Sequence, residues 1–145
     1  PDIYDDMLRC GKKIFAVAAD DNHNKFPIEH PKFDSFGGFT MIKAEKLEYC
    51  AVTDALFAGN FYASQGPEIY NLYIEDNKVF ITCSDAQMIV LNTARRSAQS
   101  VIAPAGESVN KVEFTFEEED IYIRLTVKDS NGKFANTNAY FIQDI

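Results

Sequence analysis

Apolar and polar positions follow two different patterns along this 145-residue chain. From residue 68 onward apolar residues alternate with polar ones, which is typical of strands with one buried face. Before that point the apolar residues fall at helical spacing or in continuous runs. The turn residues Gly66 and Pro67 lie where the pattern changes. We therefore predict a boundary there, between an N-terminal region (residues 1–66) and a C-terminal region (residues 67–145).

The C-terminal region predicts an antiparallel β-sandwich or open barrel. A hairpin is expected where two alternating runs flank Asp76 and Asn77, because these residue types favour tight turns. Residues 93–111 have no clear period and include a loop at Pro104 and Gly106. Several short strands joined by tight turns are typical of sandwiches. We expect strands near 70–74, 79–83, 88–91, 112–116, 121–127 and 133–142, with an acidic turn at 117–120.

The N-terminal region predicts a mixture of helices and strands. Its most distinctive segment is the continuous apolar run Ile14 to Ala19, which favours a strand buried on both faces, as in a parallel sheet. Because such a strand needs neighbours on both sides, we expect residues 1–66 to be rearranged, partly disordered or paired with another copy. The other elements expected are a helix at 3–10, a long loop at 24–38, a strand at 39–42, a helix at 48–58 and a strand at 61–64.

A polar cluster follows the apolar run directly: Asp20, Asp21, Asn22 and His23. Polar residues at the carboxyl end of a buried strand are where α/β folds usually place their chemistry. Residues at i and i+2 at the end of a strand point to the same side, so Asp21 and His23 could reach one cation. Asp and Asn are also common in turns, so a simple turn is the alternative.

Three segments in order give the N-terminal region a resemblance to a known family. They are the strand ending in residues 20–23, the segment Gly38-Phe39-Thr40-Met41-Ile42-Lys43-Ala44, and residues 55–67, which read ALFAGNFYASQGP. They resemble the end of a phosphoesterase domain of the polymerase-and-histidinol-phosphatase (PHP) family. The resemblance implies an α+β chain, in which the remnant of an α/β PHP barrel-like domain (1–66) precedes an antiparallel β-sandwich (67–145).

The resemblance also implies a metal site. Asp21 and His23 correspond to the Asp-x-His metal ligands of the family, and the metals implied are Zn, Mn or Fe. The family's other ligand motifs are not found here and would lie upstream of Pro1. The implied substrate is a phosphorylated small molecule, and the implied partner is the missing N-terminal PHP region. Because two ligands hold a catalytic metal weakly, we expect this chain alone to be inactive and assign no catalytic residue.

Ser64 is the one candidate substrate-binding residue. Its hydroxyl could hydrogen-bond a phosphate or a metal-bound water, although a serine at this position can equally close a strand. His30, Lys43 and the pair Arg95-Arg96 could also contact an anion, but exposed surface positions are the simpler interpretation for all of them.

Composition narrows the classes of function. A net charge of −8 disfavours binding to nucleic acid. No apolar run approaches the roughly 20 residues that span a membrane. Three separated cysteines (Cys10, Cys50 and Cys83) suggest no disulfide framework, and we expect two of them to be buried in a cytoplasmic protein. The competing hypothesis is a non-catalytic β-sandwich module that recognises a partner, a sugar or the rest of its own enzyme. A homo-oligomer is expected as one possible form of the chain under either hypothesis.

Overall fold

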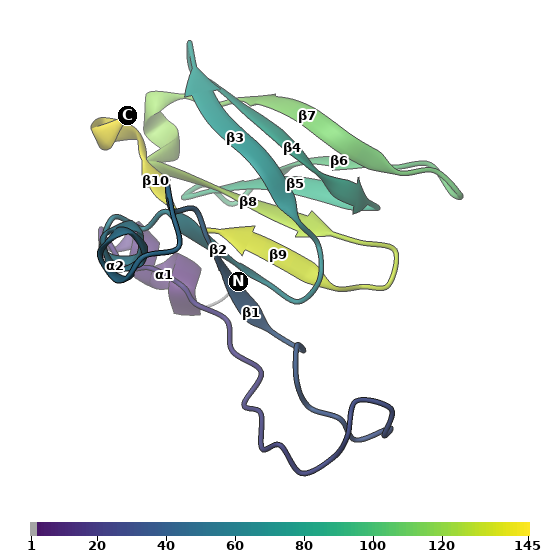
Figure 1. The fold of residues 1–145 in the computed structure, drawn as a ribbon. Helices are drawn as coiled ribbons and strands as arrows, with labels where there is room; N and C mark the ends of the chain where they lie inside the picture. The colour runs from purple at the N-terminus through teal and green to yellow at the C-terminus, as the bar shows by residue number, and fades with distance from the viewer. Residues whose placement is uncertain (1–2) are drawn as a thin grey trace.

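The alternating residues of the C-terminal region form the facing surfaces of a β-sandwich. The structure is a computed structural model and describes residues 3–145 (Figure 1). The larger sheet has the strand order β1-β2-β9-β8-β5-β6, with β10 also paired to β8, and the smaller sheet has the order β3-β4-β7. All strand pairs are antiparallel. The strands are β1 (Phe39–Ile42), β2 (Phe61–Ser64), β3 (Ile69–Glu75), β4 (Lys78–Ala86), β5 (Met88–Thr93), β6 (Gln99–Ile102), β7 (Val109–Thr115), β8 (Tyr122–Lys128), β9 (Phe134–Thr137) and β10 (Tyr140–Phe141).

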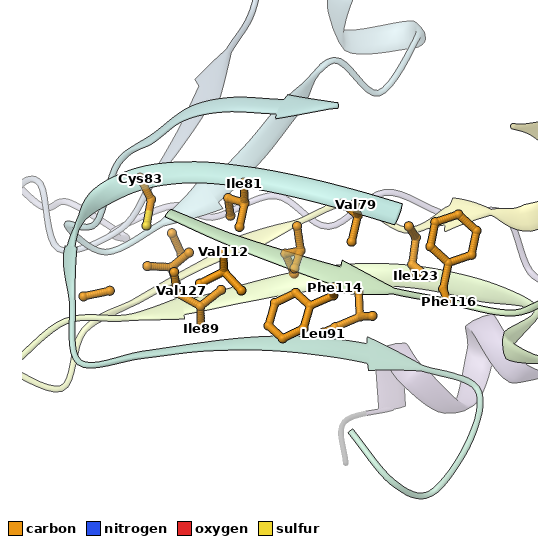
Figure 2. Close-up of a cluster of buried hydrophobic side chains, with 13 residues drawn as sticks. Val79, Ile81, Cys83, Ile89, Leu91, Val112, Phe114, Phe116, Ile123 and Val127 are labelled. Carbon is orange, nitrogen blue, oxygen red and sulfur yellow. The ribbon is translucent and has the colours of Figure 1, made fainter. Parts of the chain in front are cut away.

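The main core lies between the two sheets (Figure 2). Strand β4 contributes Val79 and Ile81 at alternate positions, and β8 contributes Leu125 and Val127 from the facing sheet. Each of these four side chains is at most 1% exposed. Complete burial of an aliphatic side chain is worth about 1.5–3 kcal/mol. The interior of the sandwich is therefore the main source of its stability.

A short helix, α1 (Ile3–Arg9), covers part of the outer face of the larger sheet. Leu8 packs there with Tyr122 and Phe141 in a second, smaller core. Beside it, the Arg124 guanidinium donates two hydrogen bonds to the Asp5 carboxylate, at 2.7 and 2.5 Å. Both side chains are less than 10% exposed. An apolar contact and a buried ion pair thus attach the N-terminal helix to the sandwich.

Most of the predicted elements are confirmed. Helix α2 (Tyr49–Phe57) lies within the predicted helix at 48–58, and β1 and β2 have the predicted bounds. The hairpin between β3 and β4 turns at Asp76 and Asn77, whose φ angles of 50° and 59° are those of a type I′ turn. The chain is thus mostly β, with two antiparallel sheets and, within residues 3–145, two short α-helices.

The predicted strand from Ile14 to Ala19 is wrong. The segment has no regular secondary structure and joins no ladder, and its residues are exposed or half-buried. Side chains of the larger sheet and of the segment after β9 hold its backbone instead: the Ala16 N–H donates to Asn138 Oδ1 at 3.0 Å, and the Ala18 N–H donates to Thr40 Oγ1 at 3.1 Å. An apolar run indicates that burial would be favourable, but it does not supply a neighbouring strand. Within residues 3–145, no strand pairs with residues 14–19.

Smaller corrections concern elements without a clear period. Strand β6 was not expected, because its sequence does not alternate between apolar and polar residues. All four of its residues are exposed, so burial imposes no such pattern. The single strand predicted at 133–142 is divided into β9 and β10, and the acidic turn is a 3₁₀ helix at Glu118–Asp120. All three cysteines are free. Two were expected to be buried, but of the three Cys83 alone is buried. No helix in the described part of the chain is long and apolar enough to cross a membrane.

The boundary predicted at residue 66 falls in the turn between β2 and β3. Strand β2 pairs with β9, so strands from both predicted regions share the larger sheet. The division into two domains and the PHP-like nature of residues 1–66 stay predictions.

Candidate functional site

The predicted metal ligands lie on a long loop that extends away from the sandwich. Residues 12–38 form this arm, which is drawn in purple and dark blue in Figure 1. Its two sides are joined by three hydrogen bonds: Asn22 Nδ2–H donates to Ser35 Oγ, the His23 N–H to Asp34 Oδ2 at 2.9 Å, and the Phe36 N–H to Asp20 Oδ2 at 2.5 Å. The polar cluster therefore folds back on residues 34–36 and forms a closed loop.

Asp34 is the partner of His23 and was missed by the sequence analysis. Its Oδ2 lies 3.3 Å from His23 Nδ1, so it can accept a hydrogen bond from that nitrogen. A carboxylate that accepts from one ring nitrogen commonly orients a metal-binding histidine and leaves the other nitrogen available. The His23 and Asp34 side chains are 53% and 30% exposed. The arrangement suits a metal ligand that remains open to a partner.

The environment of Asp34 favours its charged form. The hydrogen bond from the His23 backbone N–H is the main reason that the pKa of Asp34 lies below its ordinary value, and partial burial acts in the opposite direction. The other carboxylate oxygen, Oδ1, is enclosed and has no hydrogen-bond partner among residues 3–145. Enclosed carboxylate oxygens without a partner are rare. This oxygen could accept a further donor or contact a cation.

Asp21 occupies an unusual backbone conformation next to this pair. Its φ angle is 54°, in the left-handed region that Asp and Asn tolerate better than most residues. The side chain is exposed and makes no hydrogen bond or ion pair with the described residues. In the part of the chain that the structure describes, no three His, Cys, Asp or Glu side chains are grouped closely enough to hold a metal. Because no strand of the described residues leads into residues 20–23, the expectation that Asp21 and His23 point to the same side of a strand end no longer applies. Their binding of a common cation stays a prediction.

Ser64 lies away from this loop, at the end of β2. Its side chain is 1% exposed, and its Oγ donates to the Pro67 carbonyl at 2.7 Å and accepts from the Gly66 N–H at 2.9 Å. The hydroxyl thus stabilises the turn between β2 and β3. Its predicted contact with substrate stays a prediction, and it would require this turn to open.

The remaining candidates have local partners. His30 stacks on Phe26 at 4.3 Å between ring centroids, within the same loop. Arg95 pairs with Glu117 at 2.8 Å and with Asp120 at 3.1 Å, so it is already engaged by the acidic stretch and offsets part of its charge. Lys43 is exposed and lines the groove between the sheets that is described next. Within residues 3–145, none of these three side chains forms a hydrogen bond or ion pair with Asp21 or His23.

A groove opens between the sheets on the side where β1, β2 and β3 meet. Its volume is about 600 Å³. Met41 and Tyr62, which are paired across β1 and β2, line one side, and residues 69–74 of β3 line the other. Four of the lining residues are tyrosines: Tyr62, Tyr70, Tyr73 and Tyr140. The residue pattern gives no sign of this groove, because the groove depends on how far one sheet extends beyond the other.

Comparison with family models, with curated proteins and with solved structures finds no match to this chain.

Proposed function

We propose that this chain supplies two metal ligands, Asp21 and His23, to a metal-dependent phosphoesterase of the PHP type. The observation that carries the proposal is the contact between His23 Nδ1 and the Asp34 carboxylate. The carboxylate lies on the Nδ1 side of the ring, which leaves Nε2 available, and a carboxylate at one ring nitrogen is usual for metal-bound imidazoles. The other ligands would come from the PHP region implied by the resemblance.

Exposed apolar side chains on the arm and around α2 support a partner domain. Val17 on the arm is 68% exposed, Leu47, two residues before α2, is 98% exposed, and Phe57, the last residue of α2, is 86% exposed. Apolar side chains exposed to this degree are ones that a partner surface could cover.

In the complete enzyme the residues of this chain would hold and orient the metal. Asp21 would contribute a carboxylate oxygen and His23 its Nε2, while Asp34 would keep the imidazole ring in place. A Zn, Mn or Fe ion so bound supplies charge for polarising a phosphoryl group and for generating hydroxide from water near neutral pH. The substrate proposed is a phosphorylated small molecule. The free cysteines agree with a reducing cytoplasmic setting.

The metal-binding step can be tested on the chain itself by NMR with Mn²⁺, whose paramagnetism broadens nearby resonances even when binding is weak. We expect selective broadening of the amides of residues 21–23 and 34. The His23→Gln variant should lose it, and His30→Gln, which alters the other histidine of the same loop, should retain it. Broadening that is uniform along the acidic surface, or unchanged in His23→Gln, would contradict the proposal.

The catalytic step requires the complete protein. We expect metal-dependent hydrolysis of a phosphate ester when the chain is joined to a PHP region with the other ligands, and none from residues 1–145 alone. Turnover by the isolated chain would show that two ligands suffice and that our account of the site is wrong.

The groove favours a second candidate function, a non-catalytic binding module. It lies between the sheets and does not include Asp21 or His23. A module of this kind would bind its partner equally well after His23→Gln, whereas the phosphoesterase would lose activity. The same substitution therefore separates the two candidates.

A further inference from the structure

Strand β3 leaves one edge of the smaller sheet open. In the sheet order β3-β4-β7, β3 pairs only with β4 among the described residues. Glu75 and Lys78 flank the two-residue turn, which is the position of a hydrogen-bonded pair. Because such pairs alternate along an antiparallel ladder, the backbone groups of Leu72 and Ile74 point away from β4. They are available to another strand.

The groove lies directly beside this open edge. Strand β7 packs on β5 and β6, and β4 packs on β8, so β1 and β2 extend beyond the smaller sheet. Leu72 and Ile74 form one wall, and Met41, Tyr62 and Tyr140 line the groove from the larger sheet. One more strand beside β3 would continue the smaller sheet and cover this apolar surface.

The edge has few of the features that natural proteins use to block strand addition. Residues 69–75 include no Lys, Arg or Pro, and Glu75 is their only charged residue. A register irregularity lies between Ile69 and Asn71, so the regular edge runs from residue 71 to 75. Tyr73, in the middle of that edge, is 46% exposed.

The charges around the groove select the kind of strand that fits. Glu68, Glu75 and Asp76 lie at the two ends of β3, and Lys43 is the only charged side chain among the described residues that line the groove. A second copy of this chain, with its own net charge of −8, would bring the same acidic groups to the contact. A segment with basic residues at its ends would instead meet opposite charges.

We propose that β3 binds an extended peptide by strand addition, with the peptide's alternate apolar residues in the groove and its basic residues near Glu68, Glu75 and Asp76. Main-chain hydrogen bonds to β3 supply affinity in this mode, and the side chains that enter the groove supply specificity. The inference deepens the second candidate function and is independent of the metal site.

The probe is a blocked peptide with alternating Val and Thr in its centre and two Lys at each end. Hydrogen exchange followed by NMR should show new protection of the Leu72 and Ile74 amides when the peptide is added. The matched control is the same peptide N-methylated at its central residues, which cannot complete the ladder. Met41→Glu should weaken binding by about tenfold or more, because it places a charge in the apolar groove.

Ile102→Glu, on the exposed strand β6, should leave the affinity unchanged. Equal binding of the N-methylated peptide, protection away from β3, or absence of protection at a peptide concentration on the order of 1 mM would overturn the proposal. Dimerisation of the chain through β3 would also overturn it, in favour of self-pairing. Because Met41 is not part of the metal loop, broadening by Mn²⁺ should be the same in Met41→Glu, so the two proposals fail separately.

Discussion

Similar apolar residues are buried in the sandwich and exposed on the N-terminal arm. Val79 and Val127 in the sandwich are 0% exposed, whereas Val17 on the arm is 68% exposed. The sandwich side chains are buried because two sheets of this chain face each other. The arm is attached by polar contacts with Asn138 and Thr40, and near its start by a few apolar contacts, where Ile14 packs on the second core and Phe15 meets Phe61 edge-on. The difference shows that apolar residues alone do not create a core and that a facing surface is also required.

The arm therefore depends on a few specific contacts, and the sandwich depends on many shared ones. Removal of one contact from the arm should release a segment without unfolding the sheets. Removal of one side chain from the core should weaken the whole sandwich, since its packing is shared among neighbours. The region of α1 lies between these extremes, because it combines the buried Leu8 with the ion pair of Asp5 and Arg124.

The largest effect is expected at that ion pair. Asp5→Ala leaves the buried Arg124 guanidinium without its carboxylate, which should cost about 3–5 kcal/mol of unfolding free energy. Urea denaturation measures it. The double variant Asp5→Leu with Arg124→Met removes both charges and should recover most of the loss. Equal destabilisation in the single and double variants would show that packing of α1, and not an unpaired charge, determines the stability.

Two matched truncations contrast the core with the arm. Leu125→Ala should lower the unfolding free energy by about 2–5 kcal/mol, because it leaves a cavity between the sheets. Val17→Ala should change it by less than about 0.5 kcal/mol, since Val17 contributes little buried surface. A loss in Val17→Ala as large as that in Leu125→Ala would mean that the arm is packed against another surface in solution.

The sequence predicts the sandwich better than the arm, because the sandwich strands follow a local pattern and the contacts of the arm do not. The hairpin at Asp76 and Asn77 is encoded locally, since alternation and turn residues are both visible within a dozen positions. The run from Ile14 to Ala19 gives no information about its neighbours, so its absence from either sheet could not be foreseen. Asp34 was missed because its contact with His23 closes an irregular loop, and no period or spacing rule connects those positions.

A glycine at the junction of arm and sandwich gives a smaller effect. Gly59 follows α2 with a φ of 74°, and a Cβ at this position would overlap the ring of Phe15. Gly59→Ala should cost about 1–3 kcal/mol through backbone strain, with further loss from displacement of the ring. Thermal unfolding measures the total. In a Phe15→Ala background the same substitution should cost less, because only the backbone strain remains; an unchanged cost would show that Phe15 does not occupy this position.

The smallest effect should be the pH dependence contributed by Asp5. Burial alone would raise its pKa, but hydrogen bonds and charge from Arg124, with a hydrogen bond from Tyr122, outweigh burial and hold the pKa below the ordinary value. A carboxyl group with a lowered folded-state pKa contributes its full stabilisation above the unfolded pKa and loses it as pH falls through the folded pKa. Unfolding free energy should therefore decline below about pH 4, the ordinary range of Asp. In the double variant Asp5→Leu with Arg124→Met the decline should be shallower, because one proton-linked group is gone while the sandwich remains. A decline of the same slope in both proteins would assign the acid sensitivity to other carboxylates, such as those around Arg95, and would separate the attachment of α1 from the response to pH.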